Sequence, residues 1–133
     1  MKSSPLVALA VLAALLLAAC ATPTIETRKR ERSTAYAALP EEHRALVDQG
    51  NIKVGMSPDA VFIAWGPPSE VLESETAEGH TTVWIYHGQW VDEYRYWVGR
   101  RLESDYQPRN YVQAEVVFQN GVVSHWRTLP KPQ

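Results

Sequence analysis

Cys20 is the only cysteine in the 133-residue chain, and it directly follows a long apolar segment. That segment covers residues 5–19, has Lys2 ahead of it and ends in small side chains. A positive start, an apolar middle and a small-residue end are typical of an export signal, and the segment is shorter than the roughly 20 residues that span a bilayer. We therefore expect residues 1–19 to be a signal peptide, with the thiol of Cys20 at the start of the exported chain.

The four residues Leu17-Ala18-Ala19-Cys20 resemble the lipobox of bacterial lipoproteins. The resemblance implies that Cys20 receives a diacylglycerol, that cleavage occurs just before it, and that its new amino group is acylated with a chain such as palmitate. Because two or more acyl chains anchor a protein stably and one does not, this would fix the chain to a membrane. Ala21 stands where retained inner-membrane lipoproteins often carry Asp, which points by analogy to the outer membrane. The alternatives are a secreted protein with an incidental cysteine and an uncleaved anchor.

Other residues that could do chemistry form weak patterns. His80 and His87 are seven residues apart, which places them on opposite faces of one strand, and no His-Glu-x-x-His or paired-cysteine motif accompanies them. Ser57 lies in a segment similar to a nucleophile elbow, but the final glycine is missing and a helix N-cap explains the serine fully. We expect no catalytic residue, no metal and no cofactor, and therefore no enzyme.

Composition and charge limit the possible partners and the domain organisation. The net charge is −2, which argues against a nucleic-acid partner, since such proteins need a basic face. Residues 20–38 begin with the lipidated cysteine and are then polar without hydrophobic periodicity, so we expect a flexible tether there. Its cluster Arg28-Lys29-Arg30 either touches anionic lipid or wall polymer or is simply solvated. Residues 39–133 are expected to form one domain.

Capping and turn residues predict the elements of that domain. Pro40 and Gly50 bracket a first helix, and Ser57, Pro58 and Gly66 bracket a second. Strands are expected over 70–75, 81–87, 111–119 and 122–128, the last two joined by the hairpin turn Asn120-Gly121. The fold class is thus α+β, with two short N-terminal helices packed on one face of an antiparallel sheet of three or four strands.

Alternation along the strands assigns side chains to the two faces of the sheet. The hairpin register places Phe118 and Val123 on the helix-covered face. The same face is expected to carry Ala114, Val116, His125 and Arg127, and to receive Val83 and Ile85. The open face is then expected to carry Trp84, Tyr86 and Trp126.

Residues 88–110 are unusually rich in tryptophan, tyrosine and arginine. They form either a strand pair or a loop packed by its own rings, and such an excursion in a small domain is usually functional. Because these residue types are enriched at protein-binding hot spots, we hypothesise a partner-binding surface. Its expected members are the rings Trp84, Tyr86 and Trp126, rimmed by Arg95, Arg100 and Arg101.

A wider pattern follows the lipobox. It contains Val54-Gly55-Met56-Ser57-Pro58-Asp59-Ala60-Val61, then Trp65-Gly66-Pro67-Pro68-Ser69, Trp84-Ile85-Tyr86 and the strand-turn-strand from Glu115 to Val123. It resembles the SmpA/OmlA, or BamE-like, family of small outer-membrane lipoproteins over residues 49–128, apart from residues 88–110.

The resemblance implies two helices on a three-stranded antiparallel sheet, an arrangement shared with β-lactamase inhibitory proteins. It also implies a periplasm-facing, non-catalytic binding or scaffold module in envelope biogenesis. The partners it implies are envelope proteins, such as the β-barrel assembly machinery, or cell-wall polymer. The alternative is an inhibitor or sensor lipoprotein that uses its sheet to bind a secreted enzyme.

Overall fold

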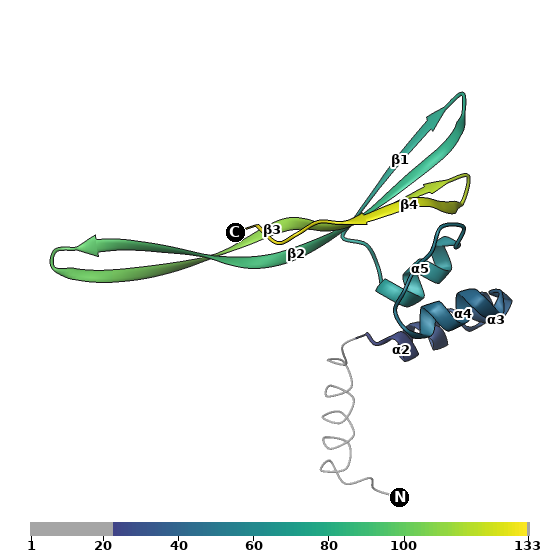
Figure 1. Ribbon diagram of the computed structural model, residues 1–133, viewed down its shortest axis with the longest axis horizontal. Helices are drawn as coiled ribbons and strands as arrows, with labels where there is room; N and C mark the ends of the chain where they lie inside the picture. Colours follow the sequence, from purple (N-terminus) through teal and green to yellow (C-terminus); the bar gives the residue numbers. More distant parts are fainter. Residues whose placement is uncertain (1–22, 133) are drawn as a thin grey trace, which may run out of the picture.

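The computed structural model describes residues 23–132, which form four short helices followed by one antiparallel sheet with the strand order β1-β2-β3-β4 (Figure 1). The predicted α+β class is confirmed, and the sheet has four strands. None of the helices in this described part is long and apolar enough to cross a membrane. The elements are α2 (Ile25–Glu31), α3 (Ser33–Ala38), α4 (Glu41–Asp48), α5 (Pro58–Trp65), β1 (Glu70–Thr76), β2 (Gly79–Val98), β3 (Arg101–Gln119) and β4 (Val122–Thr128).

Helix α5 lies where its capping residues predict it. The Ser57 side chain accepts a hydrogen bond from the backbone N–H of Ala60 at 3.3 Å, Pro58 occupies the first turn, and Gly66 ends the helix with a φ of 88°. Its apolar residues are buried, because a helix this short is stable only when it packs against something. The buried positions are Ala60, Val61, Ile63 and Ala64.

The core lies between α5 and one face of the sheet, which we call the front face. Val116, Phe118 and Val123 are buried there together with Met56 from the segment before α5. That segment also bonds to the outer edge of β4 at Val123. The Gly55 N–H donates to the Val123 carbonyl at 2.8 Å, and the Val123 N–H donates to the Met56 carbonyl at 2.9 Å. The predicted front-face positions of Ala114, Val116, Phe118 and Val123 are therefore correct.

The flexible tether predicted for residues 20–38 is wrong for residues 25–38, which form α2 and α3 and pack on α5. The main contact is Arg28, whose guanidinium donates to the carbonyl oxygens of Ile63 at 2.8 Å, Ala64 at 3.1 Å and Pro23 at 2.7 Å. Arg32 adds an ion pair with Asp59 and stacks over the ring of Phe62. Polar side chains thus dock this segment, and Ile25 and Tyr36 add apolar contacts with the core. The predicted signal peptide and the predicted lipidation site Cys20 lie outside the described residues.

A small polar network joins α2, α3 and α4. Asp48 lies 2.9 Å from the ammonium of Lys29 and accepts hydrogen bonds from the Tyr36 hydroxyl at 2.9 and 3.0 Å. The hydrogen bond from Lys29 is the main cause that holds the pKa of Asp48 below its ordinary value of 3.8.

We expect this network to make stability pH-dependent. A carboxyl with a depressed folded-state pKa stabilises the fold fully above its ordinary pKa and loses that contribution as the pH falls through the folded value. Asp48→Asn should therefore destabilise the protein modestly at pH 7 and less at pH 3, as measured by urea denaturation. The variant Glu78→Gln, in the β1–β2 turn, is the control. Equal losses for Asp48→Asn at both pH values would contradict the prediction.

The strands confirm the hairpin at Asn120-Gly121, whose two residues have φ values of 50° and 83°. The facing of the other strands differs from the prediction, because Trp84 pairs with Val116 and Tyr86 with Ala114 on the front face. A bulge between Val117 and Phe118 also shifts β4, so Trp126 lies opposite Val116. As a result Trp84, Tyr86 and Trp126 share a face as expected, but it is the helix-covered one. The open face, which we call the back face, carries Val83, Ile85, His125 and Arg127.

Candidate functional site

Among residues 23–132, the most exposed apolar surface lies on a long two-stranded arm. β1 pairs with β2 only as far as Ile85, and β4 pairs with β3 only as far as Ala114, whereas β2 and β3 remain paired to Val98 and Arg101. We call residues 87–112 the arm; it projects well beyond the rest of the sheet (Figure 1). Residues 88–110 are thus the strand pair, not the loop, of the two alternatives that the sequence leaves open.

Local chemistry explains the turn at the tip of the arm and the packing at its base. At its tip Gly99 has a φ of 61° as the first residue of a two-residue loop, which suits a hairpin turn that matches strand twist. At its base the ring of Tyr111 lies over Gly88, where an added Cβ would come within 2.7 Å of the ring. The glycine therefore lets the aromatic ring cover the neighbouring strand.

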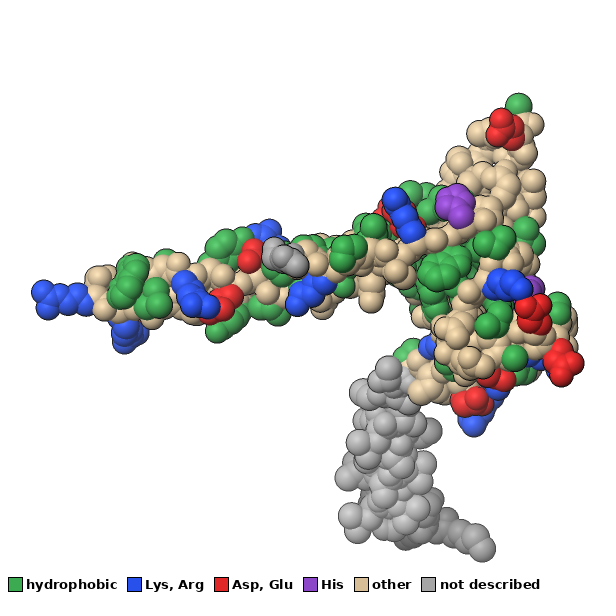
Figure 2. Space-filling view, in the orientation of Figure 1, with side chains coloured by type: hydrophobic (Ala, Val, Ile, Leu, Met, Phe, Trp, Pro, Cys, Tyr) green, Lys and Arg blue, Asp and Glu red, His purple; other side chains and the backbone are tan. Residues whose placement is uncertain are grey.

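Large apolar side chains are exposed along the whole arm (Figure 2). Trp97 is 69% exposed and Tyr106 is 62% exposed. An isolated two-stranded hairpin is marginally stable in water, and contiguous exposed apolar surface marks interaction sites. The arm therefore has the properties of a surface that another molecule covers. Its other strongly exposed apolar residues are Val91, Tyr94, Tyr96, Val98 and Leu102.

Each face of the arm combines rings with paired charges. On the back face Glu93 accepts hydrogen bonds from Arg95 at 3.2 Å and from the Ser104 hydroxyl at 3.0 Å, and Arg95 is the main cause of its lowered pKa. On the front face Arg109 donates to the Tyr94 hydroxyl at 2.8 Å. Both faces thus hold ordered polar groups between apolar ones, which favours specific binding to protein over non-specific adhesion.

The three rings predicted as a binding surface serve mainly as packing. Trp84 contacts Phe118 edge-on, with ring centroids 4.9 Å apart. The Tyr86 hydroxyl donates to the Gly66 carbonyl at 3.0 Å, and burial raises its pKa. Trp126 packs edge-on against Trp65 at 5.7 Å and remains partly exposed.

The three predicted arginines do not rim those rings. Arg95 lies on the back face of the arm, Arg101 lies on the front face opposite Val98, and Arg100 lies in the turn at the tip. They are far along the arm because β2 and β3 are uninterrupted (Figure 1). The predicted grouping is therefore wrong, although all three arginines belong to the exposed arm.

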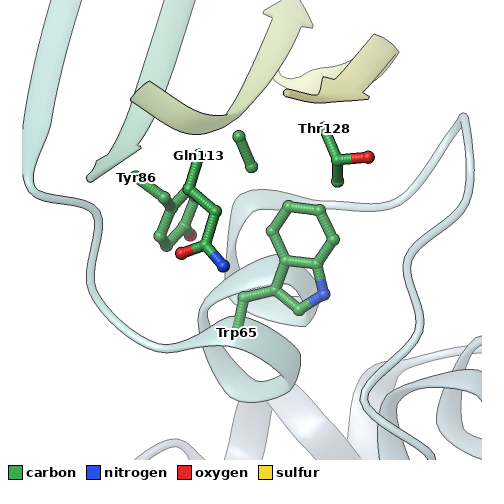
Figure 3. Close-up of a pocket in the computed structure, with 5 residues that line it drawn as sticks. Trp65, Tyr86, Gln113 and Thr128 are labelled. Atoms are coloured by element: carbon green, nitrogen blue, oxygen red, sulfur yellow. The ribbon is translucent and has the colours of Figure 1, made fainter. Parts of the chain in front are cut away.

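A cavity of about 250 Å³ lies beside the aromatic rings of Trp65 and Tyr86 (Figure 3). Trp65 reaches up from the end of α5 toward Thr128, and Tyr86 and Gln113 close the other side. Its lining includes no carboxylate, histidine or cysteine, and it is smaller than most ligand sites. Within residues 23–132 no group of three or more His, Cys, Asp or Glu side chains could hold a metal ion.

The predicted binding surface did not include four exposed apolar residues of the arm. A signal was available in Val98-Gly99-Arg100-Arg101, where a glycine opens a two-residue turn of the kind that joins two strands. The four omitted residues are Val91, Trp97, Leu102 and Tyr106.

Fold and site together define a small α+β protein with a projecting aromatic β-hairpin. Comparison with protein-family models, with curated proteins and with solved structures finds no match for this chain.

Proposed function

We propose that the chain is a non-catalytic binding module that is held to the outer membrane by lipid at Cys20 and that grips an envelope partner with its arm. The observation that carries the proposal is the exposed aromatic surface of the arm, which nothing in residues 23–132 covers. The lipobox-like end of the apolar segment supports the anchor. An anchored body with a projecting arm suits a scaffold role in envelope biogenesis, for example with the outer-membrane protein assembly machinery.

Position-specific crosslinking in intact cells tests this proposal. A photoreactive amino acid is placed at Leu102 or Tyr106 on β3 of the arm, and at Val54 on the body as a control of similar exposure. We expect the two arm positions to capture the same envelope proteins and Val54 to capture none of them. The double variant Leu102→Ser/Tyr106→Ser should reduce capture from other arm positions at least tenfold, because central apolar contacts dominate interface energies.

The result that would contradict the proposal is equal capture from the arm and from Val54. The alternative function, binding of a secreted enzyme as an inhibitor or sensor, uses the same arm. The identity of the captured protein separates the two.

A further inference from the structure

We infer that the arm pairs with the arm of a second copy of this chain, through the outer edge of β2. This goes beyond capture of an envelope protein, because it uses the backbone edge of the arm and leaves its faces free.

The outward-facing backbone groups of β2 belong to its odd-numbered residues. The Ile85 carbonyl accepts from Ser69 at 2.8 Å, and the His87 N–H donates to the Ser69 hydroxyl at 3.0 Å, both on the side away from β3. Since strands alternate, Val91, Glu93 and Arg95 also direct their N–H and C=O groups outward. No strand in residues 23–132 pairs with this stretch of edge, although backbone polar groups of this kind are a template for another strand.

Each other edge of the sheet has a feature that opposes pairing. Residues 55 and 56 bond to β4 at Val123, and the short strand β1 carries Glu73 and Glu75, whose charges discourage pairing. On β3 the arm edge contains Pro108, which has no N–H and is tolerated only where its nitrogen faces outward. The edge of β2 along the arm contains neither proline nor lysine. It is therefore the edge on which another strand can be added.

The sequence of this edge is complementary to itself. When two β2 strands run antiparallel about a two-fold axis at Tyr94, Glu93 of each copy lies opposite Arg95 of the other. In the same register Val91 lies opposite Trp97 of the second copy, and Trp90 lies opposite Val98. Opposite charges and apolar pairs directly across two strands are both stabilising. Moving the axis to Glu93 or to Arg95 places like charges opposite each other, which is destabilising.

Pairing of two arms also explains how a two-stranded arm is stable. Two strands alone are marginal, whereas three or more strands with an apolar face are stable. The paired arms form a four-stranded sheet in the order β3-β2-β2-β3. Since the axis passes through Tyr94, the contact is closed and produces a dimer without further growth.

Cysteine crosslinking on the full-length chain in its membrane tests the register. Tyr94 bonds through its backbone to its own β3, so the two copies of Tyr94 form a non-hydrogen-bonded pair with Cα atoms about 4.5 Å apart. That separation suits a disulfide. Tyr96 is on the same face two residues away, so its two copies lie roughly 13 Å apart, beyond disulfide reach. Under mild oxidation we expect Tyr94→Cys to give mostly disulfide-linked dimer and Tyr96→Cys at least fivefold less.

Charge reversal provides the second readout. Adding Arg95→Glu to Tyr94→Cys should reduce dimer formation severalfold, because glutamates then face each other, and adding Glu93→Arg as well should restore it. A failure of Tyr94→Cys to crosslink, or equal crosslinking at Tyr96→Cys, would overturn the inference. Because Leu102 and Tyr106 lie on β3, capture of a partner from those positions can succeed or fail independently of this result.

Discussion

Arg28→Met is expected to lower the free energy of unfolding by about 3 kcal/mol. Arg28 is 9% exposed, and its guanidinium donates to the carbonyls of Ile63 and Ala64 in the last turn of α5. Hydrogen bonds from a charged donor contribute about 1.5–3 kcal/mol each, and a buried carbonyl left without a donor adds its own cost. Methionine keeps most of the apolar stem but leaves both carbonyls unpaired. The loss is large for a domain of this size, whose total stability is on the order of 5–15 kcal/mol.

Equilibrium urea denaturation followed by tryptophan fluorescence measures this loss, since Trp65 and Trp84 both pack against the core. Arg30→Met is the matched control, because Arg30 is exposed on the same helix and should change stability by less than about 0.5 kcal/mol. The free energy of unfolding of Arg28→Lys should lie between those of the two methionine variants. An ammonium cannot present donors in the planar arrangement of a guanidinium. Equal stability of Arg28→Met and Arg30→Met would show that α2 does not support α5.

The parts of the fold that follow from local chemistry could be predicted from the sequence. Ser57, Pro58 and Gly66 define α5 through backbone capping, and Asn120-Gly121 defines its hairpin through φ angles that few other residues adopt. These signals act over a few residues, so no tertiary context is needed to interpret them. Helix α2 is different, because its docking depends on one arginine reaching carbonyls 35 and 36 residues away.

The facing of the rings could not be predicted, because it depends on register between strands. A single bulge beside Phe118 moves Trp126 to the front face, and the alternation of β2 places Trp84 and Tyr86 there as well. A slip of one residue exchanges the two faces of a strand. Trp65 explains why these rings lie on the helix-covered face, since its own ring packs edge-on against both Tyr86 and Trp126.

The candidate site likewise has one feature that the sequence predicts and another that depends on how the strands pair. Composition alone predicts a binding role for residues 88–110, because tryptophan, tyrosine and arginine are concentrated there. Which residues act together depends on the continuous pairing of β2 with β3, which carries Arg95 and Arg101 away from the core rings. The arginines and the core rings therefore belong to different parts of the molecule.

Cys20→Ser is expected to abolish membrane attachment of the mature chain. The proposed anchor has more than one acyl chain at this thiol, each contributing about 0.8 kcal/mol per buried CH₂, and serine cannot receive the thioether-linked lipid. The helices of residues 23–132 offer no membrane-spanning alternative. We expect incorporation of labelled palmitate to fall to background. The protein should also move from the membrane pellet to the soluble fraction or accumulate uncleaved with its signal segment.

Ala21→Asp is the matched variant, because it changes the next residue and leaves the thiol intact. It should keep its palmitate label and its cleavage, and by the analogy of lipoprotein sorting it should move from the outer to the inner membrane fraction. Cys20→Ser and Ala21→Asp together thus separate lipid anchoring from sorting to the inner or the outer membrane. Equal label and equal sedimentation of wild type and Cys20→Ser would disprove the anchor. Attachment of the arm to the membrane would then have to come from another part of the protein, such as an uncleaved signal segment.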